Sequence, residues 1–134
     1  CKETGQISSN PNSATFTWRS DVSTQDVEKK EICYTQTSIS KLSSTSVSIF
    51  QTTETNAKAA AIQGFMFVQR WNNNKWEKYA TREFNKGNTT ICESTYTVSV
   101  ESGYYYRLAV SHFAVFVDSD NSSCNTYSRA IYVN

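Results

Sequence analysis

The chain has 134 residues, of which 13 are Lys or Arg and 12 are Asp or Glu, so its formal net charge is +1. This balance gives no electrostatic attraction to nucleic acid or to an anionic membrane surface. A single proline and only four glycines argue against a linker or a low-complexity chain, and the length suits one domain with a real core. No apolar run in the sequence is long enough to span a membrane.

Apolar residues alternate with polar ones along much of the chain, which is typical of half-buried strands rather than helices. In the first half, this alternation predicts strands over 14–19, 31–40 and 45–52, followed by a loop over 53–58. A hairpin comes next, in which strands over 61–71 and 76–84 flank a turn at Asn72-Asn73-Asn74-Lys75. The turn is expected there because asparagine tolerates positive φ.

In the second half, turns are predicted at Lys86-Gly87-Asn88 and Glu101-Ser102-Gly103, with strands over 91–100, 104–117 and 126–133. About eight short strands at regular spacing favour an all-β fold, an antiparallel two-sheet β-sandwich of the immunoglobulin-like kind, and a closed sheet is the alternative. Residues 1–134 are predicted to form one domain, with 1–30 as an N-terminal strand and a polar loop that pack on it.

Four cysteines, Cys1, Cys33, Cys92 and Cys124, lie at wide and unequal spacings. Such spacing lacks the short pairs of a zinc site and favours two disulfides, and therefore a secreted or cell-surface protein. Three pairings are open, and we favour Cys1–Cys33 with Cys92–Cys124 because each closes a moderate loop. Lipidation of Cys1 is an alternative that would leave an odd number of thiols.

Two N-x-S/T triplets, at Asn88 and Asn121, fall in predicted loops and could accept glycans in a eukaryotic secreted protein. Such triplets are also frequent by chance in a chain this rich in Asn, Ser and Thr. The sequence leaves open whether either asparagine is glycosylated.

Two segments, Phe65-Met66-Phe67-Val68 and 113–117, are apolar on both faces of a predicted strand. The first thirty residues are expected to cover their outer faces, and the alternative is an exposed patch that another molecule covers. In that alternative, the candidate interface residues are Phe65, Phe67, Phe113 and Val115.

Aromatic residues cluster around the predicted hairpin, and three consecutive tyrosines, Tyr104-Tyr105-Tyr106, open a later strand. Alternation must place Tyr105 on the face opposite to its two neighbours. Exposed Trp and Tyr rings stack on sugars and anchor protein interfaces, although cross-strand pairing and core filling are the simpler roles. The candidate ligand-binding residues are therefore Trp71, Trp76, Tyr79 and Tyr105.

The stretch Tyr96-Thr97-Val98-Ser99-Val100, the turn at 101–103 and the strand that begins at Tyr104 resemble the later strands of immunoglobulin-like and fibronectin type III-like domains. The resemblance implies a tyrosine, Tyr104 or Tyr106, that braces the corner between strands. The segment 68–79 also resembles small secreted β-sandwich proteins of Gram-positive bacteria whose role is uncharacterised. Both resemblances imply extracellular binding or structural work and no particular chemistry.

No recognisable catalytic arrangement appears in the sequence, and no catalytic residue, metal ligand or cofactor is predicted. His112 is the only histidine and is interpreted as a packed or surface residue. Glu77 and Glu83 are expected on one strand face about 20 Å apart, and with Glu93 and Glu101 they are interpreted as solvated charges. The loop that begins at Asp118 lacks the glycine and the glutamate of an EF-hand.

The sequence therefore predicts an extracellular, non-catalytic binding module for a glycan or a protein surface. A self-assembling structural surface or filament protein is one alternative, and a small secreted inhibitor or effector is another. The ligand, the source and the oligomeric state cannot be read from the sequence.

Overall fold

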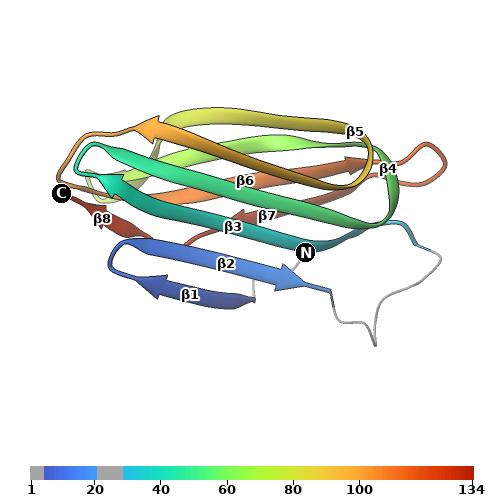
Figure 1. Ribbon diagram of the computed structural model, residues 1–134, viewed down its shortest axis with the longest axis horizontal. Helices are drawn as coiled ribbons and strands as arrows, with labels where there is room; N and C mark the ends of the chain where they lie inside the picture. Colours follow the sequence, from blue (N-terminus) through green and yellow to red (C-terminus); the bar gives the residue numbers. More distant parts are fainter. Residues whose placement is uncertain (1–4, 21–28) are drawn as a thin grey trace.

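The computed structural model describes residues 5–20 and 29–134, and their strands join into one antiparallel sheet (Figure 1). The eight strands of the described residues are β1 (Gln6–Asn10), β2 (Ser13–Arg19), β3 (Ile32–Ser43), β4 (Ser46–Asn72), β5 (Lys75–Ser99), β6 (Tyr104–Val115), β7 (Ser122–Tyr127) and β8 (Ile131–Val133). The expected all-β class and the antiparallel pairing of about eight strands are confirmed. In the described part of the chain, no helix has the length and apolarity needed to cross a membrane.

The strands β4 and β5 are 27 and 25 residues long and pair with each other along most of their length. β3 pairs with the first half of β4, whereas β6 pairs with the second half. Both long strands turn back at one end of the molecule, the right-hand end of Figure 1. The sheet therefore curls, so that the half containing β3 faces the half containing β6, β7 and β8.

The sequence predicted that strands end at 53–58 and at 86–88, and both predictions were wrong. Both segments belong to the long strands and lie at the bend, where the β4–β5 register shifts between Glu54 and Ala59. Asn88 has a φ of 51° there. Residues that favour turns thus allow a local kink in two paired strands instead of reversing the chain.

The predicted Asn-rich hairpin is confirmed. Asn73 and Asn74 have φ values of 55° and 62°, which are the left-handed values that a two-residue hairpin turn requires. Trp71 and Trp76 are direct cross-strand partners on either side of this turn. The turn therefore places two tryptophans side by side at the tip of a rigid ladder.

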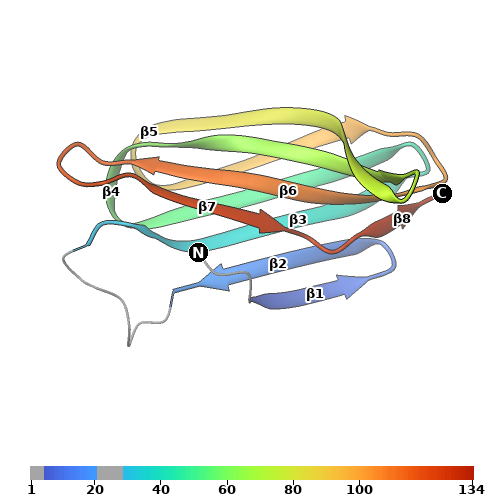
Figure 2. The same cartoon turned by 180° about the vertical axis from the view of Figure 1, so that it is seen from behind.

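The N-terminal hairpin of β1 and β2 extends the sheet beyond β3 (Figure 2). These two strands therefore do not cover the outer faces of the doubly apolar segments, contrary to the expectation for this part of the first thirty residues; residues 1–4 and 21–28 lie outside the described residues. β1 was not predicted, because its residues are exposed throughout and show no apolar alternation. The predicted strand over 126–133 is two strands, β7 and β8, separated at Ser128-Arg129-Ala130.

The predicted disulfide pairing is wrong for the described cysteines. Cys33 and Cys92 are free thiols, which excludes both Cys1–Cys33 and Cys92–Cys124, and Cys124 itself is not free. Cys1 lies outside the described residues. Cys92 lies opposite Thr53 on β4, whereas Cys124 lies opposite His112 on β6, so the two cysteines are on different strand pairs. Moderate loop length was therefore a poor guide to which thiols meet.

Candidate functional site

Outward-pointing rings gather on one half of the sheet, formed by the second half of β4, the first half of β5, and β6, β7 and β8. Strand alternation places these side chains on the side away from the core. We call this surface the aromatic face; its ring-bearing and large apolar members are Phe65, Phe67, Trp71, Trp76, Tyr105, Phe113, Val115, Tyr127 and Tyr132. Phe65, Trp71, Tyr105, Tyr127 and Tyr132 are 40–51% exposed.

Most of the candidate ligand-binding residues and all of the candidate interface residues lie on this one face, although nothing in the sequence indicated that the two sets are neighbours. Tyr105 points outward while Tyr104 is half-buried and Tyr106 is fully buried, as predicted. Tyr79 does not share it: its ring packs edge-on against Tyr106, with ring centroids 5.5 Å apart. Tyr79 is three residues from Trp76, an odd spacing that puts the two side chains on opposite sides of a strand.

Six of the eight rings of the aromatic face contact one another in pairs. Phe65 and Phe67 stack with centroids 5.9 Å apart, and Trp71 and Trp76 meet edge-to-face at 5.3 Å. Tyr105 and Tyr132 form a third pair at 4.9 Å. Such contacts hold these six rings in a fixed orientation, so a ligand that stacks on them would meet ordered rings.

Two cations, Arg107 and Lys78, lie among these rings, and neither was among the residues predicted from the sequence. The Arg107 guanidinium carbon is 4.4 Å from the ring centroid of Trp76 and 4.9 Å from that of Tyr127. The Lys78 Nζ is 4.8 Å from the centroid of Phe67. Their spacing from Trp76 and Tyr105 is even, so strand alternation was the signal that could have found them.

The aromatic face contains two open hollows. One, of about 420 Å³, lies around Gly64 and is bounded by Phe65, Phe113, Glu83 and Asn85. The other, of about 230 Å³, is bounded by Phe67, Tyr127, Gln69, Lys78 and Asn125. Each hollow thus combines rings with amide or charged groups, which is the mixture that ligand sites use for contact area and orientation.

The outward side of the other half of the sheet has a different chemistry. There, rows of hydroxyl-bearing residues cross β2, β3, β4 and β5, namely Ser13–Ser40–Ser48–Thr97 and Thr15–Ser38–Phe50–Thr95. Phe50 interrupts these rows, and Tyr34 is the other outward ring on this side among the described residues. The concentration of aromatic residues is therefore a property of one face and not of the whole surface.

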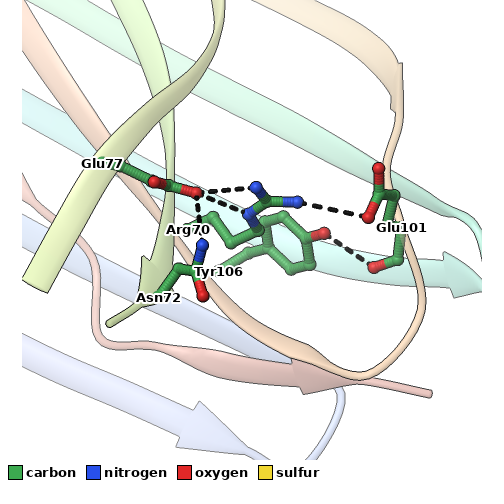
Figure 3. A network of polar contacts seen from close by, with 5 residues as sticks. All are labelled: Arg70, Asn72, Glu77, Glu101 and Tyr106. Carbon is green, nitrogen blue, oxygen red and sulfur yellow. Dashed lines mark hydrogen bonds and ion pairs between the residues drawn. The ribbon is translucent and has the colours of Figure 1, made fainter. Parts of the chain in front are cut away.

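A network centred on Arg70 supports the aromatic face from its inner side (Figure 3). Arg70 donates to Glu77 from Nε at 2.8 Å and forms an ion pair with Glu101 at 3.3 Å. Its guanidinium also lies 4.5 Å from the ring centroid of Tyr104. The Arg70 hydrogen bond holds the pKa of Glu77 below its usual range, and the same bond raises the pKa of Arg70. The network ties the tryptophan hairpin to the turn before β6.

Tyr106 braces the same corner. Its hydroxyl donates to the backbone carbonyl of Glu101 at 2.6 Å, five residues upstream (Figure 3). This contact is the kind of brace that the sequence expected of Tyr104 or Tyr106, and it is made by Tyr106. Burial raises the pKa of Tyr106, so the hydroxyl stays protonated and able to donate.

His112 belongs to a buried chain of hydrogen bonds and not to the aromatic face. Its Nδ1 is 2.6 Å from the Thr53 hydroxyl and its Nε2 is 2.8 Å from that of Thr126. Thr126 in turn contacts Thr37 at 2.5 Å, which connects β7 to β3 across the core. Burial lowers the pKa of His112 to about 3. The interpretation of His112 as a packed residue is thus confirmed.

The acidic residues are arranged differently from expectation. Glu77 and Glu83 point to opposite sides of β5, because the register shifts by one residue between Val68 and Gln69. Glu77 and Glu101 are both paired with Arg70, while their side chains stay 29% and 65% exposed to solvent. Asp118 pairs with Lys30 at 2.6 Å, and the described residues contain no cluster of three or more metal-ligating side chains.

Comparison with known proteins adds no relative. Neither a family model, nor a curated protein, nor a solved structure matches the chain. The case for a function therefore rests on the geometry of the aromatic face.

Proposed function

We propose that the chain is an extracellular, non-catalytic binding module and that the aromatic face binds a glycan. The observation that carries this proposal is the concentration of ordered, exposed rings on one face, together with amide and hydroxyl side chains between them. We also propose that the curled sheet is a two-layer β-sandwich of the immunoglobulin-like kind. The extracellular location stays an expectation that rests on the four cysteines.

The composition of the face favours a sugar chain over an apolar ligand. Sugar rings have apolar C–H faces that stack on aromatic rings, and hydroxyl groups around the edge that need hydrogen-bonding partners. The hollows supply such partners in Gln63, Gln69, Asn85, Ser111 and Asn125. Strands hold all of these residues at fixed spacing, which lowers the entropic cost of binding.

The alternative of self-assembly is supported by a separate feature, the open edges of the sheet. β1 contains no charged residue, all of its residues are exposed, and β2 is its only strand partner among the described residues. An uncharged edge of this kind can accept a strand from another molecule. β5 is also an edge strand, but its charges and its bend oppose strand addition.

Substitution of the hairpin tryptophans tests the glycan proposal. We expect the protein to be retarded in native gels that contain a soluble polysaccharide, and Trp71→Ala or Trp76→Ala to weaken binding about 30-fold. Such a loss corresponds to the roughly 2 kcal/mol that a central aromatic contact contributes. The panel should include neutral and acidic polysaccharides, with dissociation constants measured by titration calorimetry.

Leu42→Ala is the matched control, because Leu42 is 56% exposed at the β3–β4 turn, away from the aromatic face. Thermal unfolding of each variant checks that the fold is intact. Unchanged binding by both tryptophan variants, or no retardation by any polysaccharide, would contradict the proposal. If the protein forms large assemblies that a charged substitution in β1 dissolves, the assembly alternative replaces it.

A further inference from the structure

Among the described residues, three arginines stack on aromatic rings, namely Arg19, Arg70 and Arg107. Arg70 and Arg107 do so on the half of the sheet that carries the aromatic face, and their electrostatic surroundings differ. Arg70 has two carboxylate partners, Glu77 and Glu101. Arg107 has none within ion-pair distance among the described residues, and its only protein acceptor there is Gln69 Oε1, 2.7 Å from Nε. Burial without a nearby carboxylate lowers the pKa of Arg107, whereas the pKa of Arg70 is raised.

Lys78 repeats this pattern beside Arg107. It contacts the Phe67 ring and forms no ion pair with a described carboxylate. Lys78, Gln69 and Arg107 are direct cross-strand neighbours on β5, β4 and β6. Adjacent strands lie about 4.8 Å apart, so the backbones of the two cations are roughly 10 Å apart across one row of the aromatic face.

The guanidinium of Arg107 is held in place before any ligand arrives. The rings of Trp76 and Tyr127 contact it, and Gln69 fixes its Nε. Its two terminal nitrogens form no hydrogen bond with another described residue and can donate to a partner outside the chain. A fixed guanidinium suits a carboxylate or a sulfate, which can accept two parallel hydrogen bonds.

We infer that the row Lys78–Gln69–Arg107 binds the anionic group of an acidic polysaccharide. This inference rests on the proposed glycan-binding function and specifies its substrate class. The sugar ring that bears the acid lies in the neighbouring hollow between Phe67 and Tyr127, where Asn125 and Ser111 meet its hydroxyl groups. Two cations without a described carboxylate partner supply the charge complementarity, and among the described residues Glu83 is the acid of the face nearest in the ladder, two rows away.

The test compares polymers that differ in charge. Polygalacturonic acid, hyaluronan and dextran sulfate are the acidic probes; carboxyl-reduced polygalacturonic acid and dextran are the neutral ones. We expect at least one acidic polymer to bind about tenfold or more tightly than the neutral ones, the size expected for hydrogen bonds between charged groups. The double variant Arg107→Gln, Lys78→Gln should remove this difference in affinity. The single variant Arg107→Lys, which keeps both positive charges, should retain part of the difference.

Lys58→Gln is the matched charge control, because Lys58 is exposed at the bend of β4 and lies outside the row. Binding of the wild type to the acidic polymer should weaken with added salt more steeply than binding of the double variant. Poly-L-glutamate separates a glycan from an acidic protein as the ligand.

The outcomes distinguish the inference from the proposal on which it rests. If neutral and acidic polymers bind equally through Trp71 and Trp76, the inference is overturned and glycan binding stands. If poly-L-glutamate binds as tightly as the acidic polysaccharides, the cation row is real but the ligand is not a glycan, which overturns both. If no polymer binds, both also fail.

Discussion

Gly64→Ala is expected to destabilise the fold by about 3 kcal/mol or more, the upper end of the usual cost of overpacking. Gly64 lies in β4 between β5 and β6, opposite Phe84 and His112. A Cβ at this position would be 1.8 Å from the backbone carbonyl oxygen of Ser111 and 2.7 Å from the Phe84 ring. The Ser111 oxygen belongs to the paired strand and cannot move without disrupting the ladder. Thermal and denaturant unfolding measure the loss.

Gly87→Ala is the control for this experiment, because Gly87 lies in the same β4–β5 ladder. A Cβ there would meet the Ala60 carbonyl oxygen at 3.4 Å, an ordinary contact. Its stability should change by less than about 1 kcal/mol, since the lower entropy of the unfolded chain offsets small strain. Equal tolerance of alanine at both glycines would show that the close approach at Gly64 is not present in solution.

Stability is expected to fall as the pH drops below about 6.5, because His112 is buried as a neutral side chain. Its pKa is about 3 in the folded protein, against an ordinary value of 6.5 in the unfolded chain. The unfolded state therefore binds the proton first on acidification. The stabilisation is complete above pH 6.5, decreases as the pH falls and is lost towards pH 3. At pH 5 the loss is about 2 kcal/mol.

His112→Gln isolates this effect. The amide can still bond to Thr53 and Thr126 but does not titrate in this range. Denaturant unfolding between pH 7 and pH 5 should show a falling stability for the wild type and a nearly flat profile for the variant. Glu77 and Asp118 have lowered pKa values and therefore titrate below this window. Parallel slopes for the two proteins would contradict the assignment to His112.

Local signals in the sequence predicted the parts of the fold that depend on local geometry. The asparagines at 73 and 74 specify a tight turn through their own tolerance of positive φ, so the hairpin could be predicted. The bend at 53–58 and 86–88 could not, because the same residues permit either a chain reversal or a kink. Only the pairing of β4 with β3 on one half and with β6 on the other decides between them.

The aromatic face could be predicted in part for the same reason. Alternation predicted that Tyr105 points outward and made Phe65 and Phe67 candidate interface residues. Nothing local indicates that β4, β5 and β6 lie side by side with these residues in register. The row from Lys78 to Arg107 appears only once that register is known. The disulfide pairing failed in the same way, since distances between separate strands depend on the whole fold.

Indole signals in an NMR spectrum of the ¹⁵N-labelled protein test glycan binding by the aromatic face most directly. The protein has three tryptophans, of which Trp71 and Trp76 belong to the face, whereas Trp18 is buried in the core. As oligosaccharides of the bound polysaccharide are added, the Trp71 and Trp76 signals should shift with one dissociation constant while the Trp18 signal stays in place. Saturable binding that leaves both face signals unmoved would contradict the account.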